Sequence, residues 1–319
     1  MYKHKIYENI YFIYLFIIKY SNDINLKTII ITGSSNGLGL ETVKKIAKNF
    51  KNYRIIMACR NLEKANSKKE EIIKETSNPN IIVMEIDTSS LESVKNFVKN
   101  YKNSPYGKIY ALVCNAGIGG NNSGITKDGF DIIFETNHLG HFLLVNSLVS
   151  LMEENGRIII VSSDMHDPPK EMIKTNFEWI GTEKIAKPDE ALGKSNIRYS
   201  YSKLCNLYFT YEFIKRMNDK KVLINAFTPG FIPETGLNGP LKIPPQMIKI
   251  VSENHPERMG DLEKSSQALC DIITMENLIN NGEYFDRSTK TIKTSELSYN
   301  EENAKELWNI SESYVKNYY

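Results

Sequence analysis

Apolar and polar positions alternate in blocks along this chain. From residue 28 onward, short apolar runs rich in β-branched residues are separated by longer segments with a helical period. Such runs are typical of parallel strands that are covered on both faces, and the longer segments suit crossover helices. Strands are predicted at 28–32, 54–59, 81–86, 109–114, 157–162 and 222–228, with a last one at 282–286.

Two of the intervening segments show the helical period clearly. Their apolar positions are Leu38, Val43, Ile46, Ala47 and Phe50 in the first and Leu91, Val94, Phe97, Val98 and Tyr101 in the second. The second helix is expected to open with a capping box, in which Glu92 follows Ser89 by three positions. The predicted fold class is α/β: a single doubly wound Rossmann-type domain whose mostly parallel, seven-stranded sheet is flanked by helices.

Two stretches break the alternation, at 164–196 and 236–260. Both are long, contain polar residues or proline, and follow predicted strands. Because ligands bind at the carboxyl ends of the strands in such sheets, we expect these stretches to form substrate loops. We therefore predict an N-terminal extension at 1–26 and one ligand-binding domain at 27–319.

The extension contains the uniformly apolar run Ile10–Ile18. This run is too short to cross a bilayer as a helix, and Lys19–Asp23 offers no convincing cleavage site for a signal peptide. Three alternatives stay open: a membrane contact through residues 10–18, a segment that is disordered or packed on the body, and, least favoured, secretion. The expected localisation is cytoplasmic, with membrane association left open.

Charge and cysteine content bear on the class of protein. The 40 Lys and Arg residues nearly balance the 38 Asp and Glu residues, and a net charge of +2 does not favour nucleic acid as a partner. The four cysteines form no C-x-x-C pair, so we expect small buried core residues in a reducing compartment. They are Cys59, Cys114, Cys205 and Cys270.

The first predicted strand runs into the glycine-rich sequence T-G-S-S-N-G-L-G at Thr32–Gly39 and then into a helix. A pyrophosphate must approach the backbone N–H groups at that helix N-terminus, and glycine removes the Cβ atoms that would obstruct it. The spacing is G-x-x-x-G-x-G rather than G-x-G-x-x-G. Its position between a strand and a helix predicts a dinucleotide site formed by Gly33, Ser35, Asn36, Gly37, Leu38 and Gly39.

The end of the second strand indicates which nicotinamide cofactor binds. A carboxylate there would accept hydrogen bonds from a ribose diol, whereas a guanidinium would pair with a 2′-phosphate. This strand ends in Cys59, Arg60 and Asn61, without an acid. NADP(H) is therefore the predicted cofactor and Arg60 its phosphate contact, with a merely solvated Arg60 as the alternative. Asp87 and Thr88 follow the third strand, where Asp87 would accept from the adenine amino group or cap the next helix.

A Y-x-x-x-K pair, Tyr199 and Lys203, lies at the start of a long amphipathic segment. On a helix both side chains point the same way, so the Lys203 ammonium would stabilise the phenolate and lower the pKa of Tyr199 toward a useful range. An ordinary surface helix pair is the alternative. His138 and His141 invite a metal hypothesis, but no cysteine or carboxylate pattern completes a site, so no metal is expected.

Six motifs follow one another along the chain. They are T-G-S-S-N-G-L-G at 32–39, C-N-A-G at 114–117, T-N-H-L-G-H-F at 136–142, V-S-S at 161–163, Y-S-Y-S-K at 199–203 and P-G at 229–230. In this order and spacing they resemble the short-chain dehydrogenase/reductase family over residues 27–316. The phrases M-A-C-R-N, T-N-H-L-G-H-F-L-L and Y-S-Y-S-K-L-C-N are similar to the branch that holds retinol dehydrogenases and light-dependent protochlorophyllide reductases, which uses NADP(H). The run Ser295–Val315 is similar to the corresponding segment of the protochlorophyllide reductases.

The resemblance implies a catalytic tetrad. Tyr199 would protonate the carbonyl oxygen as hydride arrives, and Ser163 would hydrogen-bond the same oxygen. Lys203 would hold the nicotinamide ribose, and Asn137 would hold a water that links Lys203 to solvent. Ser162 is the alternative to Ser163, which is preferred because side chains alternate along a strand end.

The resemblance also implies the rest of the cofactor cleft: Asn115, Ala116 and Gly117 on the adenosine side, and Pro229, Gly230 and Ile232 beside the nicotinamide. Two departures from the family limit the functional prediction. The interval from Ser163 to Tyr199 is longer than in the retinol dehydrogenases and shorter than in the protochlorophyllide reductases, so the wall of the substrate pocket differs from both. The family often has a cofactor-contacting threonine after Pro-Gly, where this chain has Glu234 and places Thr235 one position later.

We therefore expect an NADP(H)-dependent oxidoreductase that transfers hydride between the nicotinamide and an apolar or aromatic carbonyl or alcohol, such as a retinoid, steroid or xenobiotic. A lid is expected from Ile243, Pro244, Pro245, Met247 and Ile248. The alternative is an NADP(H)-sensing or scaffold protein with little turnover, against which the intact tetrad argues. A small molecule is the expected partner, a homo-oligomer is usual in the family, and a membrane tether at 1–26 to a lipid substrate is a third hypothesis.

Overall fold

The computed structural model describes residues 26–120, 122–173, 176–187, 195–217, 221–238, 243 and 245–319. The apolar run at 10–18 lies outside these residues, as do Pro244 and parts of both expected substrate loops. In the described part of the chain, no helix is both long and apolar enough to cross a membrane.

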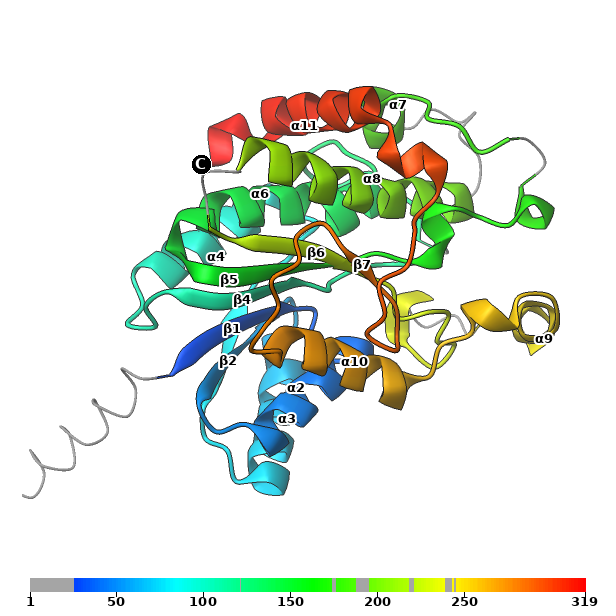
Figure 1. The fold of residues 1–319 in the computed structure, drawn as a ribbon. Helices are drawn as coiled ribbons and strands as arrows, with labels where there is room; N and C mark the ends of the chain where they lie inside the picture. Colours follow the sequence, from blue (N-terminus) through cyan, green and yellow to red (C-terminus); the bar gives the residue numbers. More distant parts are fainter. Residues whose placement is uncertain are drawn as a thin grey trace, which may run out of the picture.

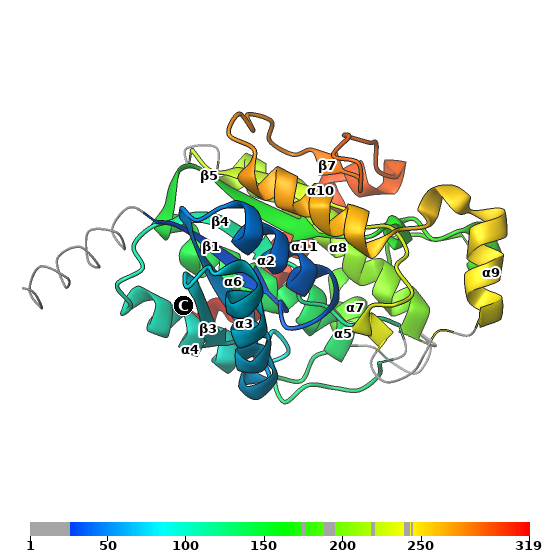
Figure 2. The ribbon, with the colours of Figure 1, turned by 90° about the horizontal axis from the view of Figure 1, so that it is seen from below.

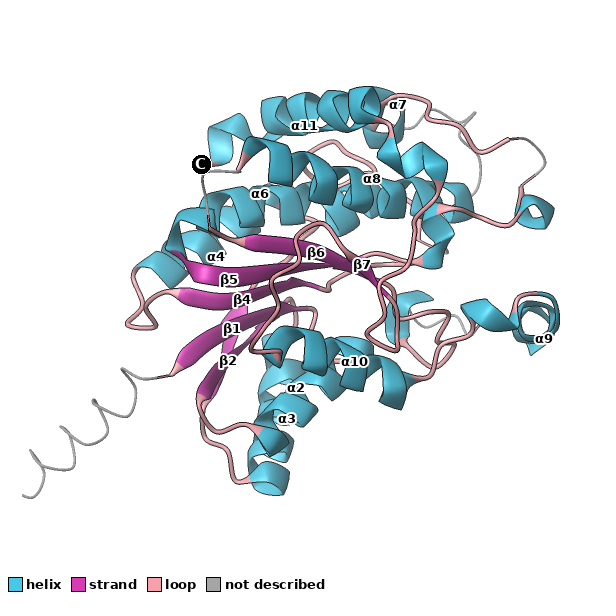
Figure 3. Ribbon diagram, viewed as in Figure 1, coloured by secondary structure: helices cyan, strands magenta, loops and turns pink. Residues whose placement is uncertain are grey.

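A parallel sheet forms the centre of the fold (Figure 1, Figure 3). Its strands are β1 (Lys27–Thr32), β2 (Tyr53–Cys59), β3 (Ile81–Glu85), β4 (Ile109–Cys114), β5 (Met152–Val161), β6 (Leu223–Phe227) and β7 (Tyr284–Phe285). The sheet has 7 strands in the order β3-β2-β1-β4-β5-β6-β7, and every neighbouring pair is parallel. The predicted seven-stranded, doubly wound α/β fold is thereby confirmed.

This strand order positions the site. The chain leaves β1 toward β2 and β3 on one side and then returns to β4 on the other side of β1. The carboxyl ends of β1 and β4 therefore form the switch point at which open parallel sheets bind their ligands.

Helices cover both faces of the sheet. Their bounds are α2 (Gly37–Asn49), α3 (Leu62–Thr76), α4 (Leu91–Lys102), α5 (Ile132–Phe134), α6 (Gly140–Leu148), α7 (Thr182–Ala186), α8 (Ser195–Arg216), α9 (Pro245–Asn254), α10 (Leu262–Thr274) and α11 (Glu301–Val315). Figures 1 and 2 show α2, α3 and α10 on one face and α4, α6 and α8 on the other, where α11 packs on the outside of α8. Each face therefore has its own apolar core.

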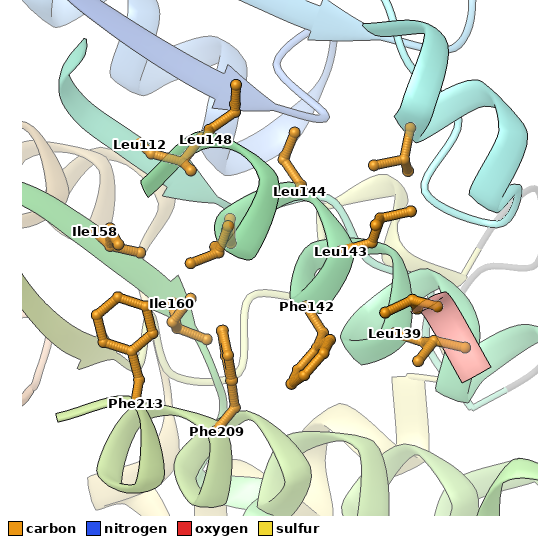
Figure 4. Packing of buried hydrophobic residues seen from close by; sticks show 14 of the residues in the cluster. Leu112, Leu139, Phe142, Leu143, Leu144, Leu148, Ile158, Ile160, Phe209 and Phe213 are labelled. Atoms are coloured by element: carbon orange, nitrogen blue, oxygen red, sulfur yellow. The ribbon is translucent and has the colours of Figure 1, made fainter. Parts of the chain in front are cut away.

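The core on the α8 side is rich in aromatic residues. Phe142 of α6 is fully buried, and its ring centroid lies 5.3 Å from that of Phe209 and 5.0 Å from that of Trp308. Figure 4 shows the residues of α6 facing Ile158 and Ile160 of β5 and the phenylalanines of α8. Burying each such side chain stabilises the fold by roughly 1.5–3 kcal/mol. This packing fixes α8 against the sheet next to the carboxyl end of β5.

Two predictions of local structure need correction. The stretch 236–260 is not simply a loop: it contains α9, a short helix that begins at Pro245 and that the proline-rich sequence before it concealed. Helix α4 is capped by Ser90, whose hydroxyl accepts a hydrogen bond from the amide of Ser93 at 3.2 Å. The capping box predicted from Ser89 is therefore wrong by one residue. The four cysteines are buried and free, as expected.

Candidate active site

A cleft of about 870 Å³ lies at the carboxyl ends of the strands. The predicted residues that line it are Gly33, Ser35, Asn36, Gly37, Leu38, Arg60, Asp87, Thr88, Asn115, Ala116, Gly117, Ser163, Tyr199, Lys203, Pro229, Gly230 and Ile232. Two other predicted residues, Gly39 and Asn137, lie behind its wall. The structure thus brings the expected cofactor residues and the expected catalytic residues into one cavity.

The glycine-rich turn after β1 has no room for side chains at two positions. Gly33 has a φ of +66°, and a Cβ built there would lie 2.8 Å from Cα of Ala116. A Cβ at Gly39 would lie 2.6 Å from the amide nitrogen of the Asn115 side chain. Gly39 therefore lets the first turn of α2 pack closely against the segment after β4.

Thr32 and Asn115 hold these two segments together. The Thr32 hydroxyl oxygen accepts hydrogen bonds from the amides of Asn115 and Ala116, both at 2.9 Å. In return, the Asn115 side-chain amide donates to the carbonyl oxygen of Thr32 at 2.8 Å. The carboxyl ends of β1 and β4 are thereby fixed side by side, and they form the floor of the cleft at the switch point.

A basic side chain stands at the end of β2, as predicted. Arg60 is 71% exposed, and its guanidinium lies 3.9 Å from a carboxylate oxygen of Asp87. The other Asp87 oxygen accepts hydrogen bonds from the amide and the hydroxyl of Ser89, at 3.0 and 2.6 Å. Asp87 therefore orders the turn before α4 while it also faces the cleft. Lys64, on the first turn of α3, lines the same end of the cleft and was missed in the sequence because only the strand end was considered.

The two serines after β5 have different environments. The Ser162 hydroxyl is 2% exposed and donates a hydrogen bond to the carbonyl oxygen of Lys203 at 2.9 Å. The Ser163 hydroxyl lies in the cleft wall and accepts a hydrogen bond from the amide of Met165 at 3.2 Å. The Ser162 hydroxyl thus serves the fold, and the Ser163 hydroxyl can still donate its proton to a ligand oxygen.

Tyr199 and Lys203 lie on one face of α8, and both line the cleft. The Lys203 ammonium nitrogen is 5.5 Å from the centroid of the Tyr199 ring. Burial raises the pKa of Tyr199 to about 12, although the Ser163 hydroxyl acts in the opposite direction. Burial also lowers the pKa of Lys203 to about 7. Burial is the largest cause of the Tyr199 shift, so this structure shows no net lowering of the Tyr199 pKa of the kind expected from Lys203.

Asn137 lies in the π-helix η1 (Glu135–Leu139), where its side chain bonds protein groups. Its oxygen accepts from the amide of Ile118 at 2.9 Å, and its nitrogen donates to the carbonyl of Ile118 and to the Ser202 hydroxyl, both at 3.0 Å. The Asn137 side chain thus supports the cleft from behind. Its main-chain carbonyl accepts from Nδ1 of His141 at 3.3 Å.

The two histidines of this motif are buried among other groups. His138 packs between the rings of Phe134 and Phe142, and its Nε2 lies 3.0 Å from the Ser311 hydroxyl. Burial lowers the pKa of His138 to about 3 and that of His141 to about 4, so both stay neutral. Among the described residues, no group of three or more His, Cys, Asp and Glu side chains is placed to hold a metal ion.

The segment after β6 closes one side of the cleft. Thr235 lines the cleft, and its Cβ lies 3.4 Å from the position of a Cβ built on Gly37. The carbonyl oxygen of Leu237 accepts a hydrogen bond from the amide of Gly119 at 2.6 Å. Of the two residues left open by the sequence, Thr235 is therefore the one in the cleft, beside the glycine-rich turn.

Further residues line the cleft that the sequence analysis did not assign to the site. They include Lys64, Ile86, Ile118, Gly119, Asp164, Met165, Pro169, Phe231, Val251, His255 and Arg258. Ile243 of the expected lid lines the cleft as well, whereas Pro245 and Ile248 on α9 do not. No single motif marks these residues, because loops and helices far apart in the sequence bring them together.

Comparison with known proteins places the chain in a family. The family model described as short chain dehydrogenase matches residues 27–173. Mouse retinol dehydrogenase 12 is 30% identical, over 89% of this chain and 85% of that protein. Chloroplastic protochlorophyllide reductase from Daucus carota is 30% identical, over 90% of this chain and 78% of that protein.

The chain belongs to the short-chain dehydrogenase/reductase family. It falls in the branch of the retinol dehydrogenases and protochlorophyllide reductases, as its motifs predicted. The WW domain-containing oxidoreductase of Gallus gallus is 34% identical over 65% of this chain, and the match spans about half of that longer protein, 49%. A solved structure of an uncharacterized protein from Mycobacterium paratuberculosis has the same fold, with a TM-score of 0.70 and 23% identity over 91% of this chain and 93% of that one.

Proposed function

We propose that this chain is an NADP(H)-dependent oxidoreductase that reduces a carbonyl group on an apolar or aromatic substrate, or oxidises the corresponding alcohol. The observation that carries the proposal is the continuity of the cleft. Arg60 stands at one end of it, and Ser163, Tyr199 and Lys203 stand at the other. A cleft with a phosphate-binding cation at one end and a proton-transfer group at the other suits a nicotinamide cofactor laid between them.

The lining of the cleft fits this cofactor. The glycine-rich turn presents bare backbone at Gly33 and Gly37, which allows a pyrophosphate to reach the N-terminus of α2. Arg60 and Lys64 offer two cations for a 2′-phosphate, and Asp87 faces the same end. When bound, the nicotinamide would supply or accept the hydride.

The catalytic side chains fit the reductive direction. A Tyr199 with a pKa of about 12 carries its proton at neutral pH and can donate it to a developing alkoxide. The Ser163 hydroxyl can donate a hydrogen bond to the same oxygen. Lys203, with a pKa of about 7, can return a proton to Tyr199 after the reaction. We assign these three residues to catalysis and Asn137 to a supporting position behind Ile118.

The apolar part of the lining supports the proposed substrate class. Apolar side chains from three parts of the chain line the cleft together with the catalytic residues: Met165 and Pro169 after β5, Phe231 after β6, and Ile243 and Val251 just before and on α9. Apolar walls with a few polar groups are typical of sites for small hydrophobic molecules. Retinoid-, steroid- and aromatic aldehyde- or ketone-like compounds are therefore the substrates to test first.

The test is NADPH consumption by the purified protein across such a panel of carbonyl compounds. We expect turnover with at least one apolar aldehyde or ketone, and loss of turnover in Tyr199→Phe with NADPH binding retained. Tight NADPH binding without turnover across the whole panel would instead support an NADP(H) sensor on the same fold. Weak binding of both NADPH and NADH would refute the cofactor assignment itself.

A further inference from the structure

His166 makes two hydrogen bonds that fix the protonation of its ring. His166 is 5% exposed and is the last residue of the 3-10 helix η3 (Asp164–His166), which begins directly after Ser163. Its Nδ1 lies 2.8 Å from the carbonyl oxygen of Ser163, and its Nε2 lies 3.1 Å from the backbone nitrogen of Ser295. The Ser295 amide can only donate, so Nε2 must be the acceptor. Nδ1 therefore carries the proton and donates it to the Ser163 carbonyl.

The surroundings hold the neutral ring in place. The ring of Tyr284 meets the imidazole edge to face, at 5.5 Å and 85°. Burial lowers the pKa of His166, with Arg258 acting in the same direction and Asp164 and Asp167 in the opposite one. Arg258 also donates to the carbonyl oxygens of Asp164 and Asp167, at 3.2 and 3.0 Å. The turn that carries Ser163 is thus held from two sides.

The partner of His166 lies far along the chain, at the start of a carboxy-terminal segment. Ser295 precedes the 3-10 helix η8 (Glu296–Tyr299), and the carbonyl oxygen of Leu297 in that helix accepts from the Tyr208 hydroxyl at 2.8 Å. Tyr208 belongs to α8, the helix of the candidate proton donor. One short segment therefore contacts both parts of the catalytic apparatus, and it lies outside the residues 27–173 matched by the family model.

We propose that His166 is a positioning residue for Ser163: its neutral imidazole ties the Ser163 main chain to the amide of Ser295, so that the carboxy-terminal segment sets the direction of the serine hydroxyl. This proposal rests on the proposed function, because it takes Ser163 as the group that binds the substrate oxygen. His166 itself touches no reacting atom.

The first part of the test requires no substrate. The full chain is labelled with ¹⁵N-histidine, and the His166 resonances are identified by their loss in His166→Asn. We expect a proton on Nδ1 and none on Nε2, unchanged from about pH 5 to about pH 8. A proton on Nε2, or an ordinary histidine titration in that range, would overturn the proposal.

Two variants then separate positioning from general packing. In His166→Asn the shorter amide can reproduce the Nδ1–H donor to Ser163 and loses the acceptor for Ser295, whereas in His166→Gln the longer amide can reproduce the acceptor and loses the donor. Each variant breaks one side of the bridge, so we expect both to lower kcat by about 10- to 100-fold with NADPH affinity unchanged. Tyr284→Phe is the matched packing control, since it keeps the ring and both hydrogen bonds, and its kcat should equal that of the wild type.

The outcomes distinguish this proposal from the proposed function. If the wild type is active and either variant keeps the wild-type kcat, or if both lose kcat only in proportion to their loss of stability, His166 is only a core residue and the positioning proposal fails. If the wild type reduces no carbonyl, the proposed function fails, while the tautomer still decides whether His166 bridges Ser163 and Ser295. If neither variant folds, the resonances that shift in Tyr284→Phe, whose ring contacts the imidazole, identify His166, and its tautomer decides the proposal.

Discussion

The ammonium group of Lys203 donates a hydrogen bond to the carbonyl oxygen of Val161, at 2.9 Å. Val161 is the last residue of β5, so a buried cation joins α8 to the strand that leads into the catalytic serine. The same ammonium is close to Tyr199. Because burial lowers the pKa of Lys203 to about 7, Lys203 gains or loses its proton in the neutral range. The protonation of one side chain thus affects both the local packing and the proposed chemistry.

The pH dependence of carbonyl reduction should follow Lys203. Below about pH 7 the ammonium can return a proton to Tyr199 after each turnover, so kcat for reduction should be high there and should fall as the pH rises through about 7. In Lys203→Arg the side chain stays charged over the whole pH range. We therefore expect this variant to have a lower kcat that no longer falls near pH 7. A midpoint that is the same in the wild type and the Arg variant would assign the titration to another group.

Cofactor preference should depend on the two cations near the end of β2. Arg60→Ala and Lys64→Ala should each weaken NADPH binding by about tenfold, with NADH binding little changed, because only NADPH carries a 2′-phosphate. Fluorescence titration with both cofactors measures this. Lys68→Ala is the matched control, since Lys68 lies on the same helix and pairs with Glu71 at 2.7 Å. Equal losses for NADPH and NADH would argue against a phosphate contact.

Glu135 should make stability depend on pH. It is fully buried, and burial raises its pKa from 4.5 to about 8, with Thr126 acting in the opposite direction and Asp128 in the same one. A raised pKa in the folded state means that the contribution of Glu135 to stability is fully present below about pH 4.5 and is lost as the pH rises toward 8.

Glu135→Gln should remove this loss. Chemical denaturation at pH 5 and pH 8 measures the free energy of unfolding of the variant and the wild type. We expect the variant to exceed the wild type by about 1 kcal/mol or more at pH 8 relative to the difference between them at pH 5. Glu154→Gln, at an exposed site paired with Lys221, should show no such gain. Parallel pH profiles for the wild type and Glu135→Gln would contradict the assignment.

The aromatic core should be sensitive at Phe142. Its ring contacts Phe209 and Trp308 and is fully buried, so Phe142→Ala should lower the free energy of unfolding by about 3–5 kcal/mol. Because the lost contacts include those of α8, cofactor affinity measured on the folded variant should fall as well. A loss below about 1 kcal/mol would mean that neighbouring rings refill the space.

The sheet could be predicted from the sequence because parallel strands that are buried on both faces consist of continuous apolar runs. Strands β1, β2 and β4 are buried along all or nearly all of their length. The cleft-lining positions of the motifs followed from their places at strand ends. Helix α9 was missed because the prolines just before it and at its first position marked the stretch as a loop, which concealed its helical period.

The remaining features depend on contacts between distant segments. The high pKa of Tyr199 reflects burial that only the folded chain provides. The hydrogen bond from Ile118 to Asn137 joins the segment after β4 to η1, and the one from Ser295 to His166 joins residues that are 129 positions apart. No pattern in the sequence around these residues predicts either bond. Spacing within a motif predicts which residues meet on one element, and it does not predict what a loop from another element places against them.

The π-helix η1 also displaces the side chains within it. The amide of Gly140 bonds the carbonyl of Glu135, five positions back, so this turn holds one residue more than an α-helical turn. A π turn of five residues and the α-helical turn that would replace it both complete about one revolution, so deleting one residue of Glu135–Leu139 would leave Asp131 of the α5 cap and Phe142 of α6 facing nearly as they do now. The effect of the extra residue is therefore local. It moves the side chains inside the turn, Asn137 among them, away from the positions that a regular helix would give them.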